Sequence, residues 1–136
     1  MGTQGSKEGV REGLVLDAGG LIAFERAEKR VAAFLEEAME LGEEIVVPAS
    51  VLAQTWRGGP RAARLSKLIA NSETDPLDEP RAKEVGERLG SRGTADIADA
   101  HVVCCALDRR AALVTTDSND MNALVEPRED LTLVSV

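Results

Sequence analysis

The chain has 136 residues, enough for one domain with a buried core, and its formal net charge is −8. This charge argues against a protein that binds nucleic acid through broad electrostatic attraction, but it is compatible with an enzyme that gathers carboxylates around a metal ion. Aromatic residues are too scarce (one Trp, two Phe and no Tyr) for a platform on which single-stranded bases stack, so the core must be built from aliphatic side chains.

The first half of the chain alternates short aliphatic runs with helical segments. Proline and glycine residues mark where the elements begin and end. The predicted elements are, in order, a buried strand at 13–17, one or two helices over 18–42, a strand at 45–47, a helix over 49–57 opened by Pro48, a helix over 61–70 and a short edge strand at 73–77.

The second half repeats this alternation. The predicted elements are a helix over 79–93 capped by Asp78, a helix over about 94–106 capped by Thr94 or Ser91, a strand at 111–117, a helix over 120–125 and a strand at 131–136. Strands that alternate with helices predict an α/β fold with a mostly parallel sheet of four to five strands, covered by helices on both faces. We expect a single domain over residues 13–136.

Three aspartates are placed so that this fold would bring them together. Asp17 and Asp117 each end a predicted strand, at the edge where open α/β sheets bind ligands, and Asp99 lies in the first turns of a helix. Asp99 shares its helix face with apolar residues, and the helix dipole favours its charge by only about 0.3–1 kcal/mol. Such a cluster would repel itself at neutral pH, and a hard divalent cation such as Mg²⁺ or Mn²⁺ would remove the repulsion.

Four segments in this order resemble the PIN domain, and more narrowly the VapC toxins of prokaryotic type II toxin–antitoxin pairs. They are LVLDAGGLIAFER (14–26), VVPASVLAQTWRGGPR (46–61), DIADAHVVCCAL (96–107) and AALVTTDSNDMNAL (111–124). The resemblance implies a PIN-like three-layer α/β/α sandwich and Mg²⁺- or Mn²⁺-dependent cleavage of RNA by a metal-activated water. It also implies a small cognate antitoxin and a homodimer.

Matched by position, the resemblance assigns catalytic and metal-ligating roles to Asp17, Asp99 and Asp117. Many PIN domains carry a glutamate where this chain has Gln54, whose amide is uncharged. Either Asp96 or Glu25 then supplies the missing carboxylate, or the site has one charge fewer. Asp96 is favoured as a further metal ligand because it lies on nearly the same helix face as Asp99.

Other residues near these aspartates have weaker assignments. Thr116 or Thr115 is expected to hydrogen-bond a ligand carboxylate. Asp120 lies one helical turn after Asp117, but in the sequence DSND it is more typical of a cap or turn residue than of a ligand. Asp17 by itself could equally be a helix cap.

The segment from Ile45 to Ser72 contains no acidic residue. At helical spacing Arg57, Arg61 and Arg64 would nearly align, unless the glycines and proline between them break the register. They form either a solvated face that pairs with glutamates or a contact surface for RNA phosphates or an antitoxin. Trp56 is either core filler or, if exposed, an anchor for a partner, which the resemblance favours.

The remaining candidates have structural interpretations. His101 projects about 200° around the helix from Asp99, which favours packing or an interface over a general base. Cys104 and Cys105 are adjacent, so they predict small core residues and no disulfide framework. With one histidine and no second cysteine pair, no zinc site is expected.

Two classes of function remain open at this point. The first is a metal-dependent ribonuclease that acts as a toxin, and the second is a catalytically degenerate PIN-like module that only binds protein or RNA, for which Gln54 would mark the lost catalysis. A phospho-receiver domain is disfavoured because the first strand ends in a single acid and no lysine follows Asp117.

No apolar run approaches the ~20 residues that span a bilayer, so we expect a cytoplasmic protein with a flexible flank at residues 1–12.

Overall fold

The protein is described by a computed structural model that covers residues 13–60 and 62–136. The strands are β1 (Leu14–Leu16), β2 (Ile45–Pro48), β3 (Glu73–Asp75), β4 (Ala112–Thr115) and β5 (Leu133–Ser135). The helices are α1 (Ala18–Glu25), α2 (Lys29–Glu40), α3 (Ala49–Thr55), α4 (Ala62–Ala70), α5 (Glu79–Arg92), α6 (Ile97–Arg109) and α7 (Ser118–Asn122). The flank predicted at residues 1–12 lies outside the described residues.

The strands form one parallel sheet in the order β3-β2-β1-β4-β5. The chain runs outward from β1 to β3 and then returns to place β4 on the other side of β1, where Leu16 pairs with Val114. The order of the strands therefore reverses between β1 and β4. In open α/β sheets, ligands bind beyond the carboxyl ends of the strands at such a reversal.

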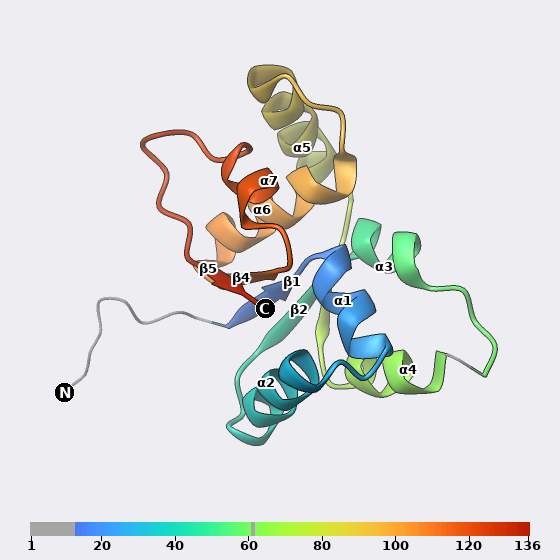
Figure 1. The fold of residues 1–136 in the computed structure, drawn as a ribbon. Coiled ribbons are helices and arrows are strands. Elements are labelled where there is room, and N and C mark those ends of the chain that lie inside the picture. Colours follow the sequence, from blue (N-terminus) through green and yellow to red (C-terminus); the bar gives the residue numbers. More distant parts are fainter. Residues whose placement is uncertain (1–12, 61) are drawn as a thin grey trace.

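Helices cover both faces of the sheet, so the expected three-layer α/β/α sandwich is confirmed. Right-handed crossovers place the helices between β1 and β3 on one face and those between β3 and β4 on the other. In Figure 1, α1, α2 and α4 lie on one side of the strands and α5 and α6 on the opposite side. Helix α6 packs against β1, β2 and β4, and therefore crosses behind the reversal point.

The core is aliphatic, as the composition predicted. Leu14, Val15 and Leu16 are fully buried because a parallel strand is covered on both faces. Cys104 and Cys105 are buried and free, which confirms their assignment as small core residues. In the part of the chain that the structure describes, no helix is long and apolar enough to cross a membrane.

The structure decides one detail of the predicted elements and corrects another. Residues 18–42, predicted as one or two helices, form two, because the chain turns at Ala27, a non-glycine residue with φ of +57°. The cap of α6 is Asp96, and the prediction of Thr94 or Ser91 was wrong: the Asp96 Oδ1 accepts the Asp99 N–H at 2.9 Å. Ser91 lies inside α5, which ends at Gly93 in the left-handed conformation, so the next helix starts later than expected.

Gly13, immediately before β1, cannot be replaced by a residue with a side chain without strain. Its φ is +126°, and a Cβ there would lie 2.7 Å from the backbone oxygen of Glu44. We expect Gly13→Ala to lower the free energy of unfolding, measured by urea denaturation, by about 1–3 kcal/mol. Gly42→Ala is the matched control, because Gly42 has φ of +75° but open space around it. Equal losses for the two variants would contradict the proposed clash.

Candidate active site

Asp17 lies directly after β1 and is 3% exposed. Its Oδ1 accepts the backbone N–H of Gly20 at 2.7 Å, so it caps α1, and its Oδ2 accepts the Thr115 hydroxyl. Burial raises the pKa of Asp17, the hydrogen bonds from Thr115 and Gly20 oppose this shift, and the negative charge of Asp117 adds to it. Asp17 therefore caps α1, as one interpretation predicted, and also lies at the carboxyl edge of the sheet.

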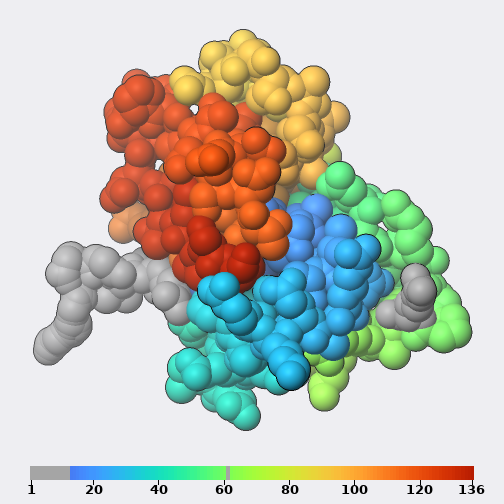
Figure 2. Space-filling view, viewed as in Figure 1, coloured from blue at the N-terminus to red at the C-terminus, as the bar shows by residue number. Residues whose placement is uncertain are grey.

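Asp117 is joined to Asp17 through the end of β4. The buried Thr115 donates its hydroxyl proton to Asp17 and accepts the backbone N–H of Asp117 at 2.8 Å. Asp117 in turn caps α7 by accepting the Asp120 N–H at 3.2 Å. In the space-filling view, the blue surface that follows β1 meets the orange surface of this segment, although the two are far apart in the sequence (Figure 2).

The threonine that hydrogen-bonds a candidate ligand is Thr115, and the other expected candidate, Thr116, makes no such bond. Successive side chains of a strand point to opposite sides, so only one of the two can face Asp17. Thr116 is exposed and its hydroxyl lies over the start of α1, where a Cβ on Gly19 would come within 2.1 Å of it. Gly19 thereby allows the close approach of β4 and α1.

Asp99 is half-buried in the first turn of α6. Burial, followed by the negative charges of Asp96, Asp17 and Asp120, raises the pKa of Asp99 to about 6. The pKa of Asp120 is raised by its hydrogen bond with Asp117 and by the charge of that residue. Of the two structural roles expected for Asp120, cap or turn residue, the cap was wrong, because Asp117 caps α7 and Asp120 lies in its first turn.

Acids from three parts of the chain thus meet at the reversal point of the sheet. No lysine or arginine in residues 13–60 and 62–136 forms an ion pair with the members of this set, which we call the acidic cluster: Asp17, Asp96, Asp99, Asp117 and Asp120. Carboxylates that repel one another without a basic partner are compatible with a hard cation.

The ligand geometry is incomplete. Among the described residues, no group of three or more His, Cys, Asp or Glu side chains is arranged so that it could hold a metal ion. Asp17, Asp96 and Asp117 each use one oxygen to cap a helix. The donors fit Mg²⁺ or Mn²⁺ in chemistry, and one or two carboxylates with several retained waters is a common way of binding Mg²⁺.

Gln54 is exposed near the end of α3. It lines an open hollow between α3 and the start of α6, where Asp96 also lies. Glu25, the other candidate for the missing acid, is the last residue of α1.

The helical register that would have aligned the basic residues is broken, which was one of the two alternatives. Arg61 lies outside the described residues, and α3 ends before Arg57, so Arg57 and Arg64 share no helix. The Arg64 guanidinium donates a hydrogen bond to the Phe24 carbonyl at 2.7 Å and lies over the Phe24 ring, 4.4 Å from its centroid. Arg64 therefore has partners inside the domain. Trp56 is 39% exposed and lines an apolar hollow with residues of α3 and α4.

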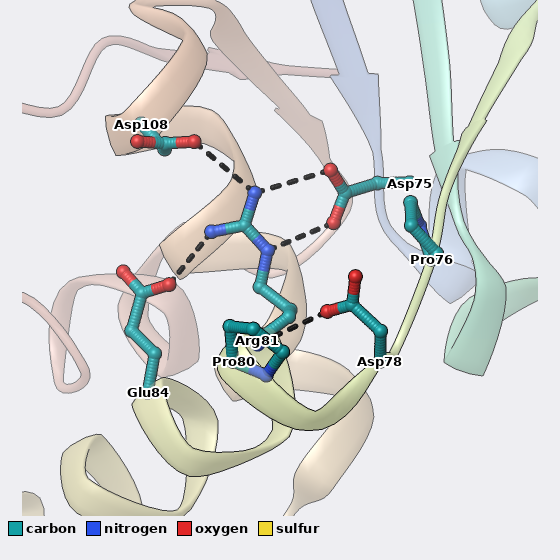
Figure 3. A pocket seen from close by; sticks show the side chains of 7 residues that line it. All are labelled: Asp75, Pro76, Asp78, Pro80, Arg81, Glu84 and Asp108. Carbon is teal, nitrogen blue, oxygen red and sulfur yellow. Dashed lines mark hydrogen bonds and ion pairs between the residues drawn. The ribbon is translucent and has the colours of Figure 1, made fainter.

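A buried ionic network around Asp75, at the end of β3, was not predicted. Asp75 is 2% exposed and accepts hydrogen bonds from Arg81, Arg109 and His101. In Figure 3 the Arg81 guanidinium points between Asp75, Glu84 and Asp108. His101 is fully buried, as its packing interpretation required, and joins Ser50 to Asp75. Arg81 is only six residues from Asp75, but His101 and Arg109 are 26 and 34 residues away, so no local pattern could have shown the whole network.

A five-stranded parallel α/β sheet with acids gathered at its reversal point defines the class of this protein. The PIN-domain family model matches residues 14–125, and the chain therefore belongs to the PIN-domain family. PIN domains are generally nucleases. No curated protein matches the chain significantly.

Solved structures similar to the chain include three toxin–antitoxin assemblies. VapBC2 from Rickettsia felis, bound to a promoter DNA fragment, is 17% identical with a TM-score of 0.66, covering 90% of this chain and 98% of that one. DNA-bound VapBC from Salmonella typhimurium is 15% identical with a TM-score of 0.65, covering 90% and 97%. A toxin–antitoxin complex from Klebsiella pneumoniae is 15% identical with a TM-score of 0.65, covering 86% and 99%. At these identities the similarity shows a shared fold.

Proposed function

We propose that this protein is a Mg²⁺- or Mn²⁺-dependent endoribonuclease that acts as the toxin of a toxin–antitoxin pair. The observation that carries the proposal is the acidic cluster, in which carboxylates from the ends of β1 and β4 and the start of α6 raise one another's pKa without a basic partner in the described chain. Membership of a family of nucleases supports a hydrolytic role.

Asp17, Asp99 and Asp117 are the proposed catalytic acids and metal ligands, with Asp96 as a further ligand. A bound Mg²⁺ or Mn²⁺ would lower the pKa of a water and stabilise the charge of the phosphodiester transition state. Asp17 is held in place by Thr115 and Gly20, so its carboxylate is oriented before substrate binds. The raised pKa of Asp99, which burial and the neighbouring carboxylates cause, is consistent with a site that a cation would stabilise.

The toxin role and the antitoxin partner are supported by the similar structures, which are complexes of toxins with antitoxins. The homodimer stays a prediction from the family resemblance. The partly exposed Trp56 and the exposed Arg57 are the candidate contacts for an antitoxin or for RNA. An antitoxin is expected to suppress cleavage when it covers the carboxyl edge of the sheet.

Cleavage of RNA by the purified protein tests the proposal. With Mg²⁺ or Mn²⁺ present, we expect endonucleolytic products from a mixed RNA, followed by gel electrophoresis. Excess EDTA should abolish the products, and replenishing the metal should restore them. The absence of metal-dependent products would instead favour the catalytically degenerate binding module. The uncharged Gln54 and the incomplete group of metal ligands are the observations that support this alternative.

A further inference from the structure

The hollow between α3 and the start of α6 differs in character from the acidic cluster beside it. It has a volume of about 480 Å³, within the ~300–1,000 Å³ typical of small-molecule pockets. Alanines of both helices and Ile97 form its apolar wall, while Ser50, Gln54 and Asp96 supply polar groups. We call it the α3–α6 hollow; Figure 1 shows the two helices that form it, which pack against each other.

Two side chains of the hollow lack partners within the fold. Ile97 is 53% exposed, although it is the first residue of a helix whose next turns are almost wholly buried. The amide of Gln54 makes no hydrogen bond to another residue of the described chain and remains free to donate and accept. An exposed aliphatic side chain beside a free amide is suited to a flat ligand that has an apolar face and a polar edge.

Ser50 adds a fixed polar atom to the hollow. Its Oγ lies 2.7 Å from Nδ1 of His101, whose Nε2 lies 2.8 Å from the Asp75 carboxylate. Because a carboxylate only accepts, Nε2 carries the proton, and in the neutral ring Nδ1 must accept the Ser50 O–H. The lone pairs of Ser50 are then left for a donor on a ligand.

The hollow is continuous with the acidic cluster through Asp96. Asp96 lines the hollow, and its charge also acts on Asp99. The segment from Ile45 to Ser72, which includes all of α3, contains no acidic residue in a chain of net charge −8. An anionic strand can therefore approach the cluster most easily along α3.

We propose that the α3–α6 hollow binds one unstacked nucleobase of the RNA substrate, next to the scissile phosphate, and that Gln54 reads the edge of that base. This inference rests on the proposed ribonuclease function. Single-stranded RNA is read by hydrogen bonds to splayed bases, and a glutamine amide can donate and accept at one base edge. A glutamate at this position would only accept hydrogen bonds. In this proposal Gln54 determines specificity, and the change from glutamate to glutamine is more than the loss of a metal ligand.

Four short RNAs that differ only in the base beside the mapped cleavage site test the proposal. We expect kcat/KM of the wild type to differ between the best and the worst base by on the order of 10-fold or more. Gln54→Ala should bring the four values close together. Gln54→Glu should change the order of preference. If Gln54→Glu instead raises cleavage of all four RNAs equally, the residue is only a lost metal ligand and the proposal is overturned.

Ile97→Ala should raise KM for all four RNAs several-fold, because the apolar wall contacts the base face. Leu77→Ala is the matched control, since Leu77 is also an exposed aliphatic residue, at 38%, and lies outside the hollow. Equal KM values for the wild type and both variants would contradict the placement of the base.

A binding measurement separates this inference from the proposed function. If none of the RNAs is cleaved, the ribonuclease proposal fails, and fluorescence anisotropy of the same four RNAs in Ca²⁺ then tests the hollow alone. Base-dependent affinity that disappears in Gln54→Ala supports the base-binding hollow. Equal affinities in the wild type, or no binding, overturn it even if cleavage is observed.

Discussion

Asp99→Asn is expected to lower metal-dependent RNA cleavage by at least about 100-fold. Loss of a residue that merely orients a metal ligand costs about 10- to 100-fold, and a ligand itself should cost at least as much. Asp99 is the member of the acidic cluster on which three other acids act, so its charge is central to cation binding. Cleavage is measured as initial rates over a range of Mn²⁺ and Mg²⁺ concentrations.

Asp99→Asn should increase the stability of the folded protein when no metal is present, although it lowers cleavage. The folded-state pKa of Asp99, about 6, is above its ordinary value of 3.8, so ionisation of Asp99 opposes folding. Ionisation of Asp99 therefore costs no folding free energy below pH 4, an increasing amount between pH 4 and 6, and its full amount above pH 6. Asp99→Asn should therefore raise the Tm at pH 7.5 and leave it unchanged near pH 4.

Thermal unfolding with and without Mg²⁺ checks both expectations. At pH 7.5 the metal should raise the Tm of the wild type and have a smaller effect on Asp99→Asn, because the variant has less repulsion to neutralise. Asp130→Asn, an exposed acid near the C-terminus, is the matched control for the loss of one negative charge. A wild-type Tm that is independent of metal would argue against a cation at the acidic cluster.

Asp75→Ala is expected to lower the free energy of unfolding by about 3–5 kcal/mol, because it leaves buried donors without their acceptor. Asp75 accepts hydrogen bonds from Arg81 at 3.0 and 3.1 Å, from Arg109 at 3.0 Å and from His101 at 2.8 Å. Burial by itself would raise the pKa of Asp75, but the hydrogen bonds from Arg81, His101 and Arg109 outweigh it and lower the pKa.

Urea denaturation at pH 7 measures this loss. Asp108→Ala is the matched control, because Asp108 also pairs with Arg81 but its side chain is 65% exposed, and such surface pairs contribute about 0–1 kcal/mol. Since the pKa of Asp75 is lowered, its contribution is present above the unfolded-state pKa and is lost as the pH falls through the folded-state value. Similar losses for the two variants at pH 7 would refute the importance of the buried network.

Much of the fold and part of the candidate site were predicted because their signals are local. GLVLD and AALVTTD each contain consecutive aliphatic residues before a polar end, which is typical of a parallel strand buried on both faces, and each was found to contain a strand. The assignment of Asp17 and Asp117 to the ends of neighbouring strands depends only on chain order and the parallel sheet. Their catalytic and metal-binding roles remain predictions.

Local signals failed where two nearby residues had similar propensities. Thr115 and Thr116 are adjacent and identical, and only the pleat of β4 decides that Thr115 faces Asp17. Asp96, Thr94 and Ser91 are all good caps, and the choice among them depends on where α5 ends, at Gly93.

The sequence by itself determined the order of elements, the aliphatic core and the placement of acids at strand ends, since each of these follows from side-chain periodicity along neighbouring residues. Only the tertiary structure decided which distant residues meet: Ser50, His101 and Asp75 come from α3, α6 and β3, and Gln54 faces a hollow shared with Asp96. The physical reason is that a hydrogen bond between elements depends on how helices pack across the sheet, and that packing is set by the whole core.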